Sequence, residues 1–375
     1  MIGTGSELSA KAKRKLRQII GTYYDVQDVR ERTEQRINDY AEEEALAACI
    51  GEEEVQKLRL LPDHNQSYKA ALRDRKFTAK EEKAIKEAGS LYDHEKAHPE
   101  DAERVKFARA FMAAAAELQD EKRHKTVAQE MFHSETLCKT LAMDEIENHP
   151  LWIEWLSHVR GIGPCLAGGI LAWINIEKCL HVGNLWSYAG QTVTIEKYIC
   201  AGCNVILDPD KVPSLEERVA QGGLREAPRC PKCNNFLRVM GHAVRREKGK
   251  KLGYNPAVKT LAWKIGESFV KCSAEKSGYR RLYDQFRERI EAKVAANNGF
   301  CHKIHKDKEG KLINGGKCFN AHVYAMAKRA TVKIFLSHVY KRWRDLLGLP
   351  TTPPFPFGMM GHDMSGYIEP IVDPD

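Results

Sequence analysis

The sequence predicts a mainly α-helical protein with one small β insertion, and three observations carry that prediction. Apolar residues recur at helical spacing among charges from near the start, with no proline before Pro62. All six tryptophans lie beyond Pro150, so the richest hydrophobic core is expected there. Two Cys-x-x-Cys pairs lie among alternating, strand-like residues. With 375 residues, 43% of them hydrophobic, the chain can build one large core or two to three smaller ones.

Residues 1–149 are expected to form a charged, coiled-coil-like helical arm. Leu16, Ile19, Ile20 and Tyr23 follow a helical spacing, which suits a coiled coil that joins two copies of the chain. The pattern loses its apolar positions near Arg30 and Thr33, so an ordinary bundle helix is an equal alternative. Residues 62–100 are polar and weakly patterned, with a loop predicted at 93–100, and helix is expected again from about 101 to 148.

The remainder is expected to hold a helix-hairpin-helix-like domain, interrupted by a small inserted β zinc ribbon at 195–240. The domain is assigned to residues 150–194 plus 241–349. Its expected helices cover 151–159, 164–174, 183–190, 256–274, 278–297 and 318–347. The last residues, 350–375, are rich in proline and glycine and are expected to be an irregular strap or a mobile tail.

Composition favours a cytoplasmic protein without a membrane segment. The longest uncharged stretch, 161–176, is too short for a membrane span and holds four glycines and a proline. The start has no apolar signal-peptide core. Eleven cysteines without a secretion signal point to a reducing compartment, where cysteine pairs are more often metal ligands than disulfides.

The strongest motif is the pair Cys200-x-x-Cys203 and Cys230-x-x-Cys233. Two such knuckles place four thiolates on two tight turns, where backbone amides can bond the sulfurs around a tetrahedral zinc ion. A thioredoxin-like redox pair, or four unrelated cysteines, is the alternative. Four protein ligands leave no position for a water molecule, so the predicted zinc is structural.

A second zinc is predicted at Cys301, His305, Cys318 and His322. Each cysteine is followed by a histidine four residues later, and two ligands at this spacing share one face of a helical turn. His302 could replace His305. Two buried cysteines beside two surface histidines are the alternative that needs no metal.

Charge and one glycine-rich corner point to a polyanionic partner. Residues 1–150 hold 25 Lys and Arg against 30 Asp and Glu, whereas the rest of the chain holds 34 against 21, a net charge of +13. The corner Gly161-Ile162-Gly163-Pro164 lies between two expected short helices, where successive amides at a helix N-terminus attract phosphate. A tight corner without a ligand, on an ordinary lysine-rich surface, is the alternative.

These residues resemble a known family. The corner at 161–164, the following apolar helix and Leu185 to Gly190 are similar to the C-terminal domain of DEDD-type insertion-sequence transposases, which include the Piv/MooV invertases. Residues 255–275, 278–284 and 325–329 are also similar, so that the resemblance covers about 150–190 and 240–347. It implies a DNA-binding domain related to site-specific recombinases.

Two departures from that family remove its catalytic residues from the prediction. Family members begin with a RuvC-like fold whose acidic residues hold magnesium, whereas here residues 1–60 are charged helix. The family's serine nucleophile also has no counterpart, because the only serine between Gly190 and Pro256 is Ser214, inside the ribbon. A basic loop at 245–251 stands at the matching place. No catalytic residue is therefore assigned, and activity is not expected from the chain on its own.

The sequence thus predicts a DNA-binding protein that acts as a recombination accessory or regulator, with duplex or junction DNA as its ligand. For each proposed contact, an ordinary solvated side chain is the alternative. The expected DNA contacts are Arg160, Gly161, Gly163, Arg245, Arg246, Lys248, Lys250, Lys251, Lys259, Lys264, Lys328 and Arg329.

Two other functions remain open at this stage. One is a transposase subunit that needs a RuvC-like nuclease in trans. The other is an RNA-binding zinc protein, and a guide RNA is a further partner that the sequence leaves open. Preference for structured RNA over duplex DNA would distinguish the RNA binder from the other two.

Overall fold

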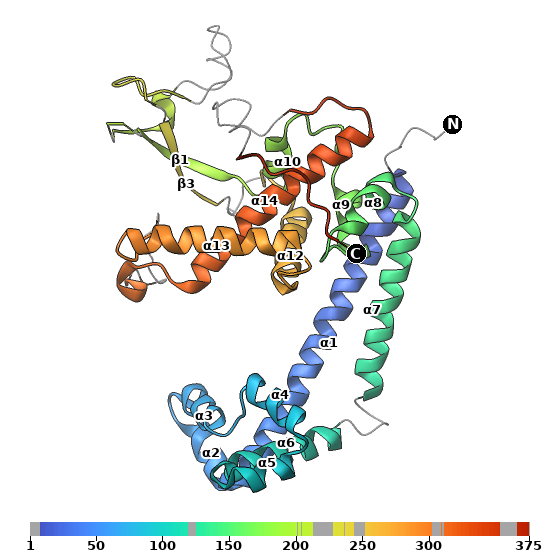
Figure 1. Cartoon of the computed structure of the whole chain (residues 1–375), viewed down its shortest axis with the longest axis vertical. Helices are drawn as coiled ribbons and strands as arrows, with labels where there is room; N and C mark the ends of the chain where they lie inside the picture. Colours follow the sequence, from blue (N-terminus) through green and yellow to red (C-terminus); the bar gives the residue numbers. More distant parts are fainter. Residues whose placement is uncertain are drawn as a thin grey trace. The chain divides into compact units, whose positions relative to one another are not determined.

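The protein is mainly helical, as the sequence predicts (Figure 1). The computed structural model describes residues 8–118, 125–200, 202–203, 205–212, 228–235, 237–243, 252–301, 309, 311–352 and 366–374. These residues form two compact units, one of Gly21–Lys139 and one of Met1–Ile20 with Thr140–Asp375. We call them the arm unit and the main unit. Their boundaries fall within the two long helices α1 (Ala10–Ile50) and α7 (Lys125–Ile146).

The arm unit is built from short helices with small apolar clusters. Its further elements are α2 (Glu52–Leu60), α3 (His64–Arg73), α4 (Ala79–Ala88), α5 (Leu91–Ala97), η1 (Pro99–Asp101) and α6 (Ala102–Leu118). One cluster centres on Leu46, Leu72 and Phe107, and another on Phe77 and Val105. These clusters are small because most positions of the arm carry charged or polar side chains.

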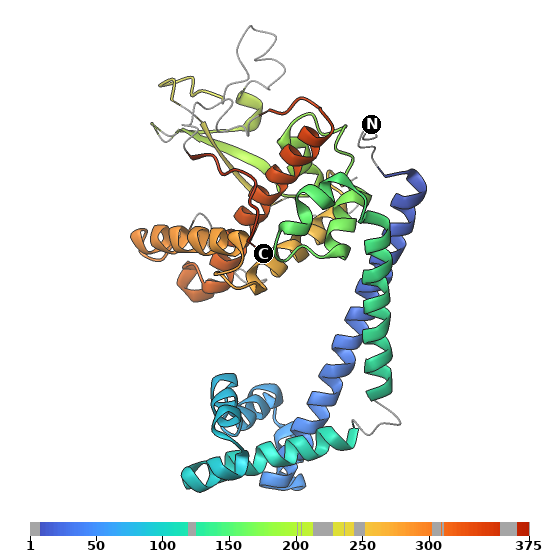
Figure 2. The same ribbon diagram turned by 45° about the vertical axis from the view of Figure 1, so that its right-hand side comes forward.

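The predicted loop at 93–100 is wrong over most of its length, because α5 continues to Ala97. The Ser90 hydroxyl caps this helix by accepting a hydrogen bond from the Asp93 amide at 3.2 Å. Further along the arm, α1 and α7 run side by side (Figures 1 and 2), and Arg30 of α1 forms an ion pair with buried Glu135 of α7 at 2.5 Å. That pairing satisfies a carboxylate which would otherwise be costly to bury.

The main unit is organised around its last long helix. Its helices are α8 (Pro150–Glu154), η2 (Leu156–His158), α9 (Pro164–Trp173), α10 (Val182–Tyr188), η3 (Pro209–Lys211), α12 (Pro256–Lys271), α13 (Gly278–Ala296), η4 (Ile313–Gly316) and α14 (Asn320–Leu346). Helix α14 packs against α13, α12, α10 and α8. In its centre, the Phe335 ring lies 5.6 Å from that of Trp155 and 5.2 Å from that of Phe269. Tryptophan and phenylalanine from distant segments thus share one core.

The predicted β insertion is a three-stranded antiparallel sheet. Strand β1 (Val193–Cys200) lies between β2 (Ile206–Leu207) and β3 (Leu237–Ala243). Tyr198 is opposite Leu207 on one side and Val239 on the other. This register places the cysteine at the end of β1 next to the start of β3, where the second cysteine pair has just ended.

The described end of the chain, residues 366–374, crosses the core as an irregular segment that we call the C-terminal strap. The Trp155 indole N–H donates to the Ile371 carbonyl at 2.9 Å, and a ring nitrogen of His338 donates to the Ile368 carbonyl at 2.7 Å. Of the two forms expected for the tail, a strap or a mobile end, the strap describes these residues. Buried polar side chains hold its backbone, since the strap belongs to no helix or sheet.

Candidate metal centre

Four cysteine sulfurs converge at the open end of the β sheet. The Sγ atoms of Cys200, Cys203, Cys230 and Cys233 all lie within 4.8 Å of one another. Cys200 Sγ is 3.2 Å from Cys233 Sγ, and Cys203 Sγ is 3.7 Å from Cys230 Sγ. A tetrahedral ion with metal–sulfur distances of about 2.3 Å needs sulfurs about 3.8 Å apart. The four thiols therefore fit a metal ion.

Backbone amides support these sulfurs, as expected for two knuckles. The amides of Gly202 and Cys203 donate to Cys200 Sγ at 3.3 and 3.4 Å. In the second knuckle, the Lys232 amide donates to Cys230 Sγ at 3.4 Å. Amide donors stabilise thiolates, so both turns are shaped for negatively charged sulfur.

The surroundings shift the pKa values of the two thiols of the first knuckle in opposite directions. The Cys203 amide, partly opposed by burial, lowers the pKa of Cys200 to about 6. At Cys203 the Val205 amide favours the thiolate, but burial and the neighbouring thiols raise its pKa to about 11. A divalent cation among the sulfurs removes this conflict, because it stabilises every thiolate at once.

The ribbon has its own small core. Buried Cys200 and Cys230 pack with Val212 and Leu237, and Tyr198 lies at the margin of this cluster. Two of the four sulfur-bearing residues are thus themselves core residues. Because so little apolar area is buried, a metal ion would supply much of the ribbon's stability.

The second predicted cluster is also brought together, for the ligands that the structure describes. Ligand atoms of Cys301, Cys318 and His322 lie within 4.8 Å of one another. Both cysteines are partly buried, and burial together with the facing Cys301 thiol raises the pKa of Cys318. His305 and the alternative His302 lie outside the described residues.

The glycine corner packs tightly against α12. Gly161 has a φ of 95°, and its carbonyl accepts a hydrogen bond from the Ser268 hydroxyl at 2.6 Å. A Cβ atom at Gly161 would lie only 3.0 Å from Cys272 Sγ. Both the left-handed backbone and the close approach call for glycine here. Gly163 is exposed and is the N-cap residue of α9.

A carboxylate already occupies one of the amides predicted to bind phosphate. The Arg160 amide donates to Asp373 Oδ2 at 2.8 Å, and the Gly278 amide donates to Asp373 Oδ1 at 2.6 Å. Asp373 is only 5% exposed, and its own amide donates to the His158 carbonyl at 3.0 Å. The corner does hold an anion, but that anion belongs to the C-terminal strap. The Arg160 side chain and Gly163 remain exposed.

The contacts of Asp373 were not predicted, because no local sequence pattern marks this residue. Its partners lie 95 and 213 residues away along the chain. A Cβ atom at Gly278 would lie 2.4 Å from an Ile371 methyl group, so the start of α13 needs glycine for the strap to pass. Such a long-range fit between a glycine and a chain end leaves no signal in spacing.

Two of the predicted DNA contacts are engaged inside the main unit. Lys328 is 8% exposed and forms an ion pair with Glu267. Arg329 donates to the carbonyls of Gln191 and Thr192 at 3.0 and 2.9 Å, and burial lowers its pKa. Both side chains are thus packed within the main unit, and neither lies on a solvated helix surface. Their side chains instead join α14 to α12 and to the start of the ribbon.

The other predicted basic contacts are partly exposed or lie outside the described residues. The Lys259 ammonium is 4.2 Å from the centroid of the Tyr254 ring, and both side chains are half-buried. Lys264 is also half-buried. The five basic residues of the 245–251 loop fall outside the described residues.

A half-buried lysine that no sequence pattern singles out, Lys333, lies one helical turn after Arg329. Lys333 is 4.3 Å from the centroid of the Trp186 ring, and the Trp186 indole donates to the Lys333 carbonyl at 3.0 Å. Burial and then the charge of Arg329 lower the pKa of Lys333. Cation–π contact compensates for part of that burial.

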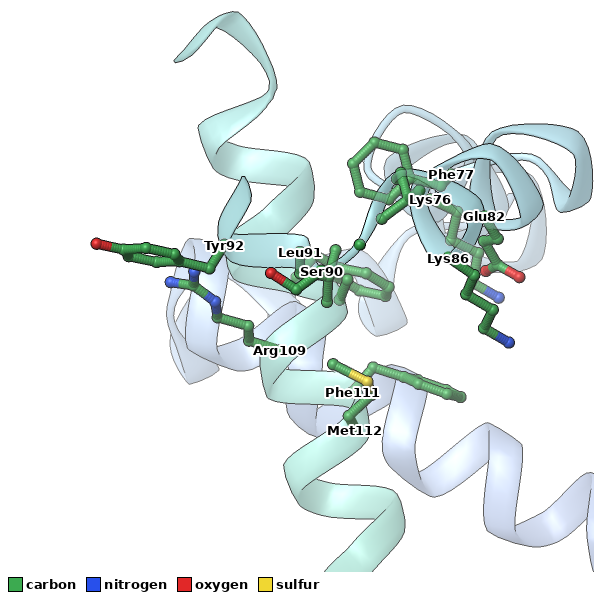
Figure 3. Close-up of a pocket in the computed structure, with 14 residues that line it drawn as sticks. Lys76, Phe77, Glu82, Lys86, Ser90, Leu91, Tyr92, Arg109, Phe111 and Met112 are labelled. Atoms are coloured by element: carbon green, nitrogen blue, oxygen red, sulfur yellow. The ribbon is translucent and has the colours of Figure 1, made fainter. Parts of the chain in front are cut away.

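The arm unit contains a pocket of about 620 Å³ lined by α4, α5 and α6 (Figure 3). Phe77, Leu91, Phe111 and Met112 form much of its wall. Charged side chains also line it, among them Glu82, Lys86 and Arg109, the last of which is paired with Glu95. The pocket is thus a mainly apolar hollow with a few charged side chains in its lining.

Comparisons with models of protein families, with curated proteins and with solved structures find no match to this chain. Among the described residues, every helix is too short or too polar to traverse a lipid bilayer.

Proposed function

We propose that this chain is a zinc-ribbon protein that binds duplex or junction DNA and serves as an accessory or regulator of recombination. In this proposal the main unit is related to the DNA-binding half of the DEDD-type transposases, with the zinc ribbon inserted into its helix-hairpin-helix-like part. The observation that carries the proposal is the net charge of +13 in residues 151–375, part of which lies on exposed side chains of the ribbon.

Zinc is proposed as the metal of the four-cysteine cluster because of its donor set. Four thiolates on two knuckles are soft ligands in a tetrahedral arrangement, which zinc prefers. The site has no open position, so the ion stabilises the ribbon and takes no part in a reaction.

The ribbon presents lysines where a phosphate backbone could reach them. Lys197 on β1, Lys211 at the end of η3 and Lys232 in the second knuckle are all exposed. Asp208 lies 4.0 Å from Lys197 and 3.6 Å from Lys211, distances at which exposed ion pairs contribute little. We assign phosphate contacts to these lysines, to the 245–251 loop and to the Arg160 side chain.

The glycine corner has a narrower role in this proposal. Its Arg160 amide is used by Asp373, so a phosphate could take that amide only in place of the strap. The corner therefore supports the proposal as an anion-holding element of the fold. It is not counted among the direct DNA contacts.

The first test is to sequence the nucleic acid that copurifies with the protein. Double-stranded DNA, released at high salt, is the expected result, because contacts to phosphates weaken as salt rises. Direct competition among a duplex, a four-way junction and a structured RNA then ranks the ligands. RNA outcompeting both DNAs would overturn the DNA assignment in favour of an RNA-binding zinc protein.

A second experiment tests the alternative that this chain is a transposase subunit. In that case a separate RuvC-like protein, added with magnesium, would cleave or join DNA only when this chain is present. Cleavage by the purified chain alone, abolished by a point substitution in it, would contradict the accessory role.

A further inference from the structure

The pair of helices α13 and α14 is well packed at one end only. All buried residues of α13 lie between Gly278 and Tyr283, and none of residues 284–296 is buried. In the first two turns of α14, only Val323 is buried before Ala327. Apolar burial therefore does little to hold the far end of this pair, where the chain passes from one helix to the other.

Three soft metal donors lie at that far end. Cys301 follows α13, Cys318 directly precedes the N-cap of α14, and His322 lies in the first turn of α14. Their ligand atoms are within 4.8 Å of one another. The Cys318 amide donates to the Gly299 carbonyl at 2.8 Å, which holds the two cysteine-bearing segments against each other.

We propose that Cys301, Cys318 and His322 bind a second zinc ion, which fastens the end of α13 to the start of α14. Two thiolates and one imidazole suit zinc better than magnesium or calcium, which prefer oxygen donors. Binding converts two thiols to thiolates and releases two protons to solvent. Three protein ligands leave a fourth position for water or another donor, whereas the ribbon site is closed.

The surroundings argue against two ordinary core cysteines. Cys301 and Cys318 are only partly buried, and the neighbouring rings of Phe300 and Phe319 are 38% and 36% exposed. A cysteine that serves as a small apolar residue would be expected inside a packed cluster. Among the described residues around the two cysteines, the exposed Phe300 and Phe319 rings form no packed cluster, and the metal supplies the cross-link in its place. This inference does not depend on the nucleic-acid ligand.

The test is zinc content per chain in the purified full-length protein and its variants. Wild type and the control Cys49→Ser, which changes a partly buried cysteine of the arm unit, should hold two zinc ions. Cys318→Ser and His322→Gln should each hold one, and Cys230→Ser should lose the other. Hydrogen exchange should rise in residues 284–300 for Cys318→Ser, and only in the ribbon for Cys230→Ser.

Cobalt titration of metal-free wild type gives a second measurement, in case a variant does not fold. Two equivalents of Co²⁺ should bind, with the thiolate charge-transfer absorption of one about half that of the other, as expected for two and four sulfurs. A single equivalent, or one zinc ion per chain that Cys318→Ser leaves unchanged, would overturn the proposal. So would a Cys301–Cys318 disulfide in protein purified without oxidant.

Discussion

The two units use their charged side chains in different ways. In the arm unit, cations mostly pair with carboxylates at the surface, as Arg109 does with Glu95 and Arg59 with Glu43. In the main unit, buried groups bind the backbone. Arg344 donates to the carbonyls of Ile176, Cys179 and Pro350. Removing a surface partner leaves a solvated charge, whereas removing a buried one leaves unsatisfied carbonyls.

This difference predicts how the stability of each unit responds to substitutions, acid and salt. The main unit joins distant segments through polar groups that water cannot replace, so it should respond strongly to single substitutions and to acid. The arm unit spreads its stability over many weak pairs and small clusters. Apart from the Arg30 pair with buried Glu135, it should respond weakly to the loss of one ion pair but measurably to salt.

The largest effect should follow from Cys230→Ser in the ribbon, whose core is a small cluster around Cys200, Val212, Cys230 and Leu237. Loss of one thiolate should release the ribbon zinc, and the amides of β1 and β3 should lose their protection from hydrogen exchange. Helices α12 and α14 should keep theirs, because their aromatic core is separate. A ribbon equally protected with and without zinc would contradict the structural role of the metal.

Arg344→Met should destabilise the main unit by about 3 kcal/mol or more, because the buried carbonyls of Ile176 and Cys179, and the partly buried carbonyl hydrogen bond of Pro350, lose their donor. Chemical denaturation followed by tryptophan fluorescence reports on this unit, since all tryptophans lie in it. The control on the same helix is Lys341→Met, which removes partly exposed ion pairs with Asp345 and with Glu369 of the strap and should cost less than about 1 kcal/mol. Equal losses of stability in Arg344→Met and Lys341→Met would contradict the difference between buried and exposed charges.

Acid should affect the main unit before the arm unit. Burial lowers the pKa of His338 to about 4, and its Nδ1 atom accepts a hydrogen bond from the Tyr279 hydroxyl at 2.6 Å. In the unfolded chain His338 binds a proton near pH 6.5, whereas in the folded chain it stays neutral until about pH 4. The free energy of unfolding therefore falls as the pH falls between these values, by at most about 3 kcal/mol.

The arm unit is expected to respond to acid at a lower pH. Hydrogen bonds from Thr78, and then from Arg104, lower the pKa of Glu81 to about 2. The contribution of Glu81 to the free energy of unfolding is complete above about pH 4.5 and is lost as the pH falls towards 2. Hydrogen exchange at pH 7, 5.5 and 4.5 should therefore show α14 losing protection while α4 retains it. Replacing His338 by Gln should flatten the response of α14, and earlier loss in α4 would contradict this order.

The smallest effect is expected from Arg109→Met in the arm unit. It removes a half-exposed ion pair with Glu95, and should change the free energy of unfolding by less than about 1 kcal/mol. The difference from wild type should shrink further at high salt, because exposed charges are screened. A cost comparable to that of Arg344→Met would show that the arm also depends on single polar contacts.

Local patterns predicted the helices and the ribbon well. The expected helix at 278–297 is observed as Gly278–Ala296, and that at 164–174 as Pro164–Trp173, because period, caps and proline positions mark such elements in the sequence itself. Cysteine spacing likewise predicted the four-sulfur cluster. The loop expected at 93–100 was wrong, since a serine cap outweighed a weak apolar pattern.

Contacts between distant segments could not be predicted in the same way. Lys328 looks like a surface lysine in its own helix, and only the packing of α12 against α14 buries it beside Glu267. Asp373 reaches the glycine corner from the end of the chain. Sequence spacing carries the period of one element but not the identity of the element that packs on it.

The most direct test of the proposed DNA binding is the salt dependence of affinity for a DNA junction, measured by fluorescence anisotropy in two matched variants. One replaces Lys197, Lys211 and Lys232 of the ribbon by Gln, and the other replaces Lys80, Lys83 and Lys86 of α4 by Gln, with the same loss of charge. The ribbon variant should bind more weakly and flatten the slope of log K against log salt by about 3 units, whereas the α4 variant should match wild type. Equal effects of the two variants, or binding that salt does not weaken, would contradict the account.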